Sequence, residues 1–240
     1  MRLRHQPENG KNNNHPIQGA ELHYFFLRGL GEVPRLLLEL SETPYDSVMY
    51  FSRKEKEYKA FAPFGQMPLY TDKTLGGTWL AQQGAIVRHI ARRLGMGGQT
   101  EKDEATIDML FEGAKDIQGE QRRRACLFVF VLLLLSAPAH ACALSGKKDF
   151  VHEGAASESA DAGKLRMYLA AADKVLGDKK FFVYDTATYA DVAMFHVLST
   201  LEEIVGPNNS YLTDAGFPRL LAFVRRFRYV HGDRQAVWSD

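Results

Sequence analysis

The sequence has few cysteines, no excess of charge of either sign and no apolar stretch near its beginning. Cys126 and Cys142 are the only cysteines among 240 residues, so neither a disulfide framework nor a cysteine-based zinc cluster is expected. Thirty Lys and Arg residues against 29 Asp and Glu residues leave a formal charge of +1, which favours neither nucleic acid nor an anionic membrane as partner. We therefore expect a small molecule or another protein as partner.

Other signals of cofactor chemistry and export are also missing. The eight histidines form no i, i+4 pair with an acidic residue suited to zinc, and no glycine-rich phosphate loop occurs, so we expect no metal and no nucleotide. Residues 1–19 are rich in Asn, His, Gln and Gly and resemble neither a signal peptide nor a strand. We interpret them as a disordered tail and expect a reducing, cytoplasmic location.

The ordered pattern begins with an aromatic run of strand length at 21–27, which ends at two glycines. Apolar residues then recur with helical spacing over 33–40, and 45–51 has the composition of a second strand. A turn at 63–68 leads into a short strand, 75–79 suggests another, and a helix follows that ends at Gly95. This βαβ-ββα order predicts an α/β domain over 20–97 with a mixed four-stranded sheet.

The second half, 98–240, shows helical periods and no convincing strand, so we predict an all-α domain. Helices are expected over 105–117, 162–176, 188–205 and 217–227. Thr188 and Asp191 have the spacing of a capping box directly before an apolar run, which predicts where the third of these helices begins.

An apolar segment at 122–145 interrupts this pattern, with three arginines followed by an uninterrupted apolar run of about ten residues. That run is too short to cross a bilayer, so we expect no membrane span. It could be a buried helix of the α-domain, an insertion that packs on a partner, or non-coding sequence translated from a mistaken gene structure. We favour the third interpretation, because the flanking residues would join sensibly without the segment.

Four short motifs, at 24–29, 63–68, 80–86 and 188–191, resemble those of the cytosolic glutathione transferases, in the same order along the chain. The likeness is greatest to the sigma-like members of the tyrosine-type classes. It implies a thioredoxin-like first domain, an all-α second domain, glutathione as co-substrate without a metal, and electrophilic, hydrophobic small molecules as second substrates. A free thiol has a pKa of about 8.5 and is only a few per cent ionised at neutral pH. The resemblance implies that Tyr24 is the catalytic residue, which holds the glutathione sulfur as a thiolate.

The resemblance also assigns the residues that bind glutathione. Met67 precedes a cis proline, Pro68, and its backbone pairs with the cysteinyl unit, while Gln66 contacts the tripeptide through its side chain. At the start of the next helix, Gln82 and Gln83 are expected to hold the γ-glutamyl carboxylate. The family pattern usually has serine at position 83, and a glutamine amide could replace that donor. Lys59 matches the cation that holds the glycyl carboxylate.

The remaining assignments concern assembly and folding. Glu112 falls where related enzymes carry an acidic residue that reaches across a dimer interface to the α-amino group of glutathione, which implies a homodimer with shared sites. The resemblance gives Arg28, Thr188 and Asp191 structural roles.

The expected activity is conjugation of the glutathione thiolate to electrophiles, and peroxide reduction or prostaglandin isomerisation would also suit a sigma-like enzyme. The alternative is a non-catalytic protein of the same fold, such as a crystallin-like or scaffold domain.

Overall fold

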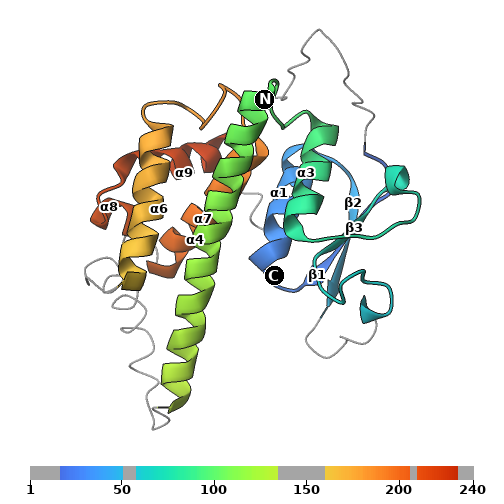
Figure 1. Ribbon diagram of the computed structural model, residues 1–240, viewed down its shortest axis with the longest axis horizontal. Coiled ribbons are helices and arrows are strands. Elements are labelled where there is room, and N and C mark those ends of the chain that lie inside the picture. The colour runs from blue at the N-terminus through green and yellow to red at the C-terminus, as the bar shows by residue number, and fades with distance from the viewer. Residues whose placement is uncertain (1–16, 51–57, 135–159, 206–209, 232–240) are drawn as a thin grey trace. The chain divides into compact units, whose positions relative to one another are not determined.

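The structure of the protein is a computed structural model that describes residues 17–50, 58–134, 160–205 and 210–231. Its described residues divide into two compact units, one within 17–104 and the other within 105–229 (Figure 1). The long helix α4 (Glu101–Leu134) begins three residues after the domain boundary predicted at 97/98 and contains the division between the units.

The first unit contains a mixed sheet of four strands, as predicted. Its strands are β1 (Ala20–Phe25), β2 (Tyr45–Tyr50), β3 (Leu69–Thr71) and β4 (Leu80–Ala81). They lie in the order β2-β1-β3-β4, with β1 parallel to β2 and antiparallel to β3, and β3 antiparallel to β4. The parallel pair requires a crossover, which helix α1 (Glu32–Leu40) provides.

Two helices of this unit, α1 and α3 (Gln83–Leu94), lie side by side against the sheet (Figure 1). The helical spacing predicted for both is confirmed, because the apolar positions Val33, Leu37, Ile86 and Ile90 are almost fully buried. Helix α3 ends at Gly95, whose φ of 67° is a left-handed conformation that glycine adopts without steric cost.

The short strand predicted at 75–79 is wrong, and the fourth strand is Leu80–Ala81 instead. A 3₁₀ turn, η2 (Lys73–Leu75), occupies the start of that stretch. Asp72 caps the turn by accepting hydrogen bonds from the backbone nitrogens of Thr74, at 2.8 Å, and Leu75, at 3.3 Å. The predicted strand is therefore occupied by the end of a capped turn and by two glycines, Gly76 and Gly77, instead of extended backbone.

Asp72 also links this turn to helix α3 and makes stability depend on pH. It is buried, and its other carboxylate oxygen lies 2.8 Å from Nε2 of His89. Burial raises the pKa of Asp72, but hydrogen bonds from Thr74 and His89 outweigh that effect and leave the pKa below its ordinary value. Ionised Asp72 therefore stabilises the fold above its unfolded pKa, and this contribution is lost as pH falls through the lower folded value.

We expect Asp72→Asn to lower the free energy of unfolding by about 1–2 kcal/mol at pH 7, because charge-assisted hydrogen bonds become neutral ones. The difference from wild type should shrink below about pH 4, near the ordinary pKa of aspartate. Urea unfolding at pH 7 and at pH 3.5 measures it, with the exposed Asp46→Asn as control. A difference that stays constant between these pH values would contradict the role given to the ionised carboxylate.

The packed part of the chain begins earlier than the sequence suggests. The sequence predicts a disordered tail that includes 17–19, yet Ile17 is buried and the carbonyl of Gln18 accepts a 3.0 Å hydrogen bond from the Lys73 nitrogen. The remainder of the predicted tail, 1–16, lies outside the described residues.

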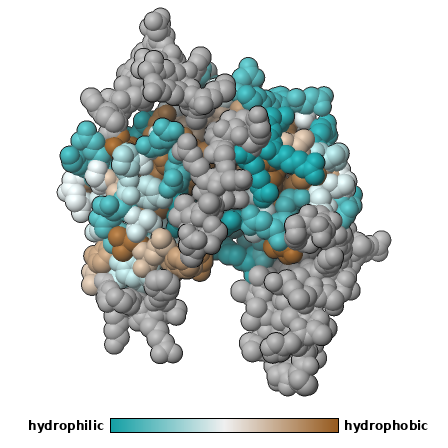
Figure 2. All heavy atoms as spheres, turned by 180° about the vertical axis from the view of Figure 1, so that it is seen from behind, coloured by the Kyte–Doolittle hydropathy of each residue, from teal (hydrophilic) through white to brown (hydrophobic). Residues whose placement is uncertain are grey.

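In its described residues the second unit is helical. Beside α4 it contains α6 (Ala160–Leu176), α7 (Tyr189–Val205), α8 (Tyr211–Asp214) and α9 (Pro218–His231). Three predicted helices correspond to α6, α7 and α9, whereas the single turn of α8 was not predicted. Figure 2 shows that the described surface of one face is mostly hydrophilic, and few large apolar side chains of the described residues are exposed.

Helix α4 is much longer than the predicted helix at 105–117, because it continues through the first part of the apolar segment to Leu134. The rest of that segment, 135–145, lies outside the described residues. Of the described helices, none has both the length and the apolar character that crossing a membrane requires.

Candidate active site

The sheet register brings three of the sequence motifs to one end of the first unit. His23 pairs with Leu69 across β1 and β3, and Leu69 pairs with Ala81 across β3 and β4. Continuing both registers by one residue places Tyr24 and Gln82 on either side of Pro68. Residues far apart in the sequence thus meet where β1 and β4 end and β3 begins.

Tyr24 lies near the end of β1 with 7% of its surface exposed. Its hydroxyl oxygen accepts a 2.9 Å hydrogen bond from the backbone nitrogen of Leu30, in the 3₁₀ turn η1 (Gly29–Gly31). A phenol hydroxyl has one proton to donate and can accept through its oxygen, so the Tyr24 proton must be directed away from the Leu30 nitrogen. Accepting this bond polarises the hydroxyl and strengthens it as a donor.

Two glycines of the turn leave room for the Tyr24 ring. A Cβ atom on Gly31 would lie 2.5 Å from Cγ and Cδ1 of Tyr24, and one on Gly29 would lie 2.6 Å from its hydroxyl oxygen. Real Cβ atoms do not approach other heavy atoms so closely. The glycines of η1 therefore leave the space that the phenol occupies.

We expect Gly31→Ala to lower the conjugating activity that the sequence resemblance implies at least tenfold, because its methyl group would displace the Tyr24 ring. Gly31 has a φ of −82°, which alanine also adopts, so the effect comes from the clash and not from the backbone. Inserting a methyl group into a packed site typically costs about 1–3 kcal/mol of stability. Initial rates with glutathione and a generic electrophile measure it. Gly119→Ala, whose Cβ would meet nothing within 4 Å, is the control. Equal rates for Gly31→Ala and wild type would show that the ring position does not limit activity.

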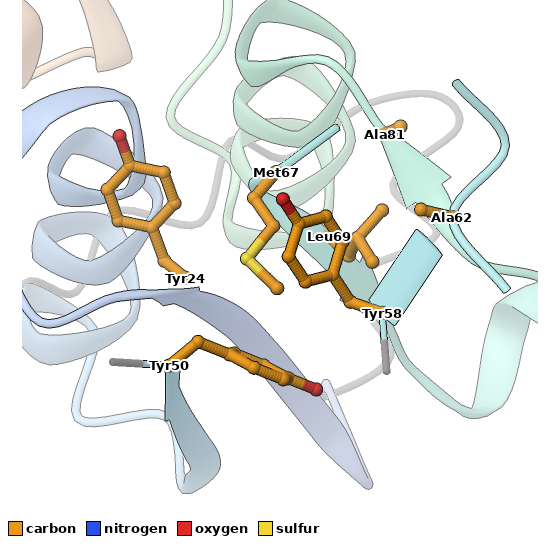
Figure 3. Packing of buried hydrophobic residues seen from close by; sticks show 7 residues of the cluster. All are labelled: Tyr24, Tyr50, Tyr58, Ala62, Met67, Leu69 and Ala81. Carbon is orange, nitrogen blue, oxygen red and sulfur yellow. The ribbon is translucent and has the colours of Figure 1, made fainter. Parts of the chain in front are cut away.

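The Met67–Pro68 peptide bond is cis, which confirms the prediction. Met67 belongs to a buried cluster with Tyr24, Tyr50 and Tyr58. Figure 3 shows the Tyr24 ring apart from the other two tyrosine rings, with its hydroxyl pointing away from the strand that carries it. The phenol therefore packs at the margin of the cluster.

Gln66 and Gln82 are exposed and lie close together, since Nε2 of Gln82 donates to Oε1 of Gln66 at 3.5 Å. Gln82 has a φ of 73°, an unusual left-handed conformation for a residue other than glycine, and directly precedes helix α3. Gln83 is the first residue of that helix and is 5% exposed. The exposed amides of Gln66 and Gln82 thus lie together directly before α3, whose first residue is the buried Gln83.

Predicted roles also fall on Lys59, Arg28 and Glu112. Lys59 is exposed, and Arg28 is half-buried directly before η1. Glu112 belongs to the second unit, where it is exposed on α4 and accepts a 2.6 Å hydrogen bond from Lys115. Their assignments remain predictions.

A chain of hydrogen bonds beside Tyr24 was not predicted. His23 is buried and its Nε2 bonds Glu21, while its Nδ1 lies 2.9 Å from the hydroxyl of Tyr50. The ring also packs against Trp79, with centroids 4.6 Å apart. The sequence offers one signal for these contacts, which is the alternation along β1. Since successive side chains of a strand point to opposite faces, His23 lies on the face opposite Tyr24.

In the second unit, Asp191 forms a buried cap at the start of α7. Its Oδ2 accepts hydrogen bonds from the nitrogen and hydroxyl of Thr188, at 2.8 and 2.6 Å, and its Oδ1 accepts one from the Phe182 nitrogen, at 2.8 Å. Asp191 has no exposed surface. Within the ranges that the structure describes, no three His, Cys, Asp or Glu side chains group as metal ligands would.

Two family profiles match the chain. "Glutathione S-transferase, N-terminal domain" matches residues 20–92, and "Glutathione S-transferase, C-terminal domain" matches residues 147–231. The chain belongs to the glutathione S-transferase family. The two matches leave 93–146 unmatched, a stretch that contains α4 and the apolar segment.

Relatives of similar length match over most of the chain. A glutathione S-transferase of Dirofilaria immitis is 28% identical over 90% of this chain and 89% of its own length. A glutathione S-transferase P of Caenorhabditis elegans is 28% identical, over 86% of both chains. The glutathione S-transferase structure from Ascaris lumbricoides aligns with a TM-score of 0.66 and 26% identity, over 88% of this chain and 92% of that one. The sigma-like class within the family remains a prediction.

Proposed function

We propose that this glutathione S-transferase conjugates the glutathione thiolate to electrophilic small molecules, and that the Tyr24 hydroxyl stabilises the thiolate. The observation that carries the proposal is the bond from the Leu30 nitrogen to the Tyr24 oxygen, which fixes a polarised hydroxyl at the sheet end shared with Pro68 and Gln82. The names of its relatives support the same chemistry.

The proposed chemistry needs a thiolate near neutral pH. A hydrogen bond to a charged group contributes about 1.5–3 kcal/mol, which lowers the thiol pKa by about one to two units from about 8.5. The thiol proton leaves to solvent, and Tyr24 keeps its own proton as the donor. A carbon–sulfur bond then forms, and in a substitution the leaving group departs with its electron pair.

The rest of glutathione would be held by groups around the same sheet end. The backbone of Met67, which precedes β3, would pair with the cysteinyl unit, with Gln66 beside it. The start of α3, at Gln82 and Gln83, would take the γ-glutamyl carboxylate. Helix α3 has neither a side-chain cap nor an acidic residue in its first turn, so its backbone N–H groups suit a carboxylate.

Two further groups complete the proposed site. Lys59 would hold the glycyl carboxylate, and its side chain is exposed. In a homodimer, Glu112 of the partner subunit would reach the α-amino group, a role that its exposed position on α4 allows. The cytoplasmic location also remains a proposal, supported by the low cysteine content.

The test is turnover of glutathione with a generic aromatic electrophile, measured for wild type and for Tyr24→Phe. Turnover by wild type that falls in the variant supports the proposal. Retention of wild type on immobilised glutathione without any turnover would instead indicate a non-catalytic member of the family.

A further inference from the structure

The hydrogen bond from the Leu30 nitrogen to the Tyr24 oxygen depends on the shape of η1. Leu30 is the middle residue of this turn, and the backbone N–H group of Glu32 closes it by donating to the carbonyl of Gly29. Both neighbours of Leu30 are glycines, which leave the backbone more conformational freedom than other residues do. The residue that follows the turn therefore matters for its shape.

That residue, Glu32, is anchored in the protein interior. It is 3% exposed, and its Oε2 accepts a 2.5 Å hydrogen bond from Nη1 of Arg35, which is 4% exposed. The carboxylate and the guanidinium thus form a buried ion pair one helical turn apart on α1. Separating such a pair is unfavourable, because each charge would remain buried without the other. The pair therefore holds Glu32 in one position.

Glu32 also stabilises the start of α1, which no side chain caps. The N-cap residue is Gly31, and Glu32 is the acidic residue of the first turn. A carboxylate at this place interacts favourably with the positive end of the helix dipole. Since η1 leads directly into α1, whatever fixes the first turn of α1 also fixes the end of η1.

We propose that Glu32 and Arg35 are positioning residues for conjugation. Their buried ion pair holds η1 so that the Leu30 N–H group points at the Tyr24 oxygen, and in this way it helps to set the thiol pKa of bound glutathione. Both residues act through Tyr24 and not on the substrate. The inference rests on the proposed function, in which the Tyr24 hydroxyl stabilises the thiolate.

The direction of the change in thiol pKa separates this role from two others. If η1 is no longer held, Tyr24 becomes a weaker donor and the thiol pKa rises. If the charge of Glu32 acted directly on the thiolate, its removal would lower the thiol pKa, because a nearby negative charge disfavours a thiolate. If the ion pair only stabilised the fold, the thiol pKa would not change.

The test uses the full chain with Glu32→Gln, which keeps the shape of the side chain but removes its charge. Initial rates between pH 6 and pH 9, with saturating glutathione and a generic aromatic electrophile, give the thiol pKa. The matched control is Glu39→Gln, the same change two turns further along α1, where Glu39 accepts a 2.8 Å hydrogen bond from the Tyr45 hydroxyl. Thermal melting verifies that each variant is folded.

We expect Glu32→Gln to raise the thiol pKa by about half a unit, a part of the one to two units expected when the Tyr24 hydroxyl is lost. Glu39→Gln should leave the thiol pKa unchanged. In a Tyr24→Phe background, Glu32→Gln should cause no further rise, because no hydroxyl remains to be positioned.

A second variant serves if Glu32→Gln does not fold. The double change Glu32→Gln/Arg35→Met removes both charges, so neither is left buried without its partner. It should raise the thiol pKa in the same direction as Glu32→Gln.

An unchanged or lowered thiol pKa in the folded variant would overturn the inference. So would an equal rise in Glu39→Gln, or a further rise in the Tyr24→Phe background, since neither effect would pass through the position of η1. A Tyr24→Phe variant with the pH profile of wild type would instead refute the proposed role of Tyr24, and this inference with it, so the two failures are distinguishable.

Discussion

Tyr24→Phe is expected to lower kcat/KM for conjugation about tenfold to a hundredfold, because phenylalanine keeps the ring packing but removes the hydroxyl. That range corresponds to the loss of one hydrogen bond to a charged sulfur, about 1.5–3 kcal/mol. Without the hydroxyl, the thiol pKa of bound glutathione should return toward about 8.5. The pH at which the rate rises should therefore be about one to two units higher in Tyr24→Phe than in wild type. Initial rates between pH 6 and pH 9 with saturating glutathione measure both effects.

Tyr58→Phe is the matched control for this experiment. Tyr58 belongs to the same buried cluster as Tyr24, and Figure 3 shows its ring near the Met67 side chain and the Tyr50 ring. Removal of its hydroxyl should leave kcat/KM and the pH profile close to those of wild type. Identical profiles for Tyr24→Phe and wild type would remove Tyr24 from the chemistry, whatever its effect on stability.

Much of the first unit was predictable because its signals are local and periodic. Val33 and Leu37 show the inward face of α1, and Gly95 shows where α3 ends. Strand β4 was misplaced because two residues, Leu80 and Ala81, are too short to show an alternating pattern. The limits of α4 were also missed, since an uninterrupted apolar run shows no amphipathic period.

The site was predictable as a set of residues but not as a set of contacts. The motifs named Tyr24 and Gln83, but the partner of the first is a backbone nitrogen six residues away, in a turn whose shape no pattern specifies. Nor does the sequence show that Oε1 of Gln83 is buried without a hydrogen-bond partner among the described residues, because this depends on what packs around the side chain. The residue types determine which hydrogen bonds are possible at the site, whereas packing determines which atoms form them.

Asp191→Ala is expected to lower the free energy of unfolding by about 3–5 kcal/mol, the largest stability effect that we predict. The change leaves the buried N–H groups of Phe182 and Thr188 without their acceptor, and each unpaired group costs about 1–3 kcal/mol. Urea unfolding monitored by circular dichroism measures the loss. Thr188→Val removes only the hydroxyl bond and should cost about 1 kcal/mol. A loss below that of Thr188→Val would show that the cap is dispensable.

The pH dependence separates this cap from that of Asp72. Burial raises the pKa of Asp191 despite the hydrogen bonds from Thr188 and Phe182, so the folded state favours its protonated form. The contribution of this ionisation is therefore fully present below the unfolded pKa, about 3.9, and is lost as pH rises through the higher folded value. The advantage of wild type over Asp191→Ala should thus be greater at pH 4 than at pH 7, whereas its advantage over Asp72→Asn should shrink on acidification. Asp72 and Asp191 are both buried, yet their contributions to stability should change in opposite directions with pH. That result would show that the balance of desolvation and hydrogen bonding, rather than burial alone, sets the direction of a pKa shift.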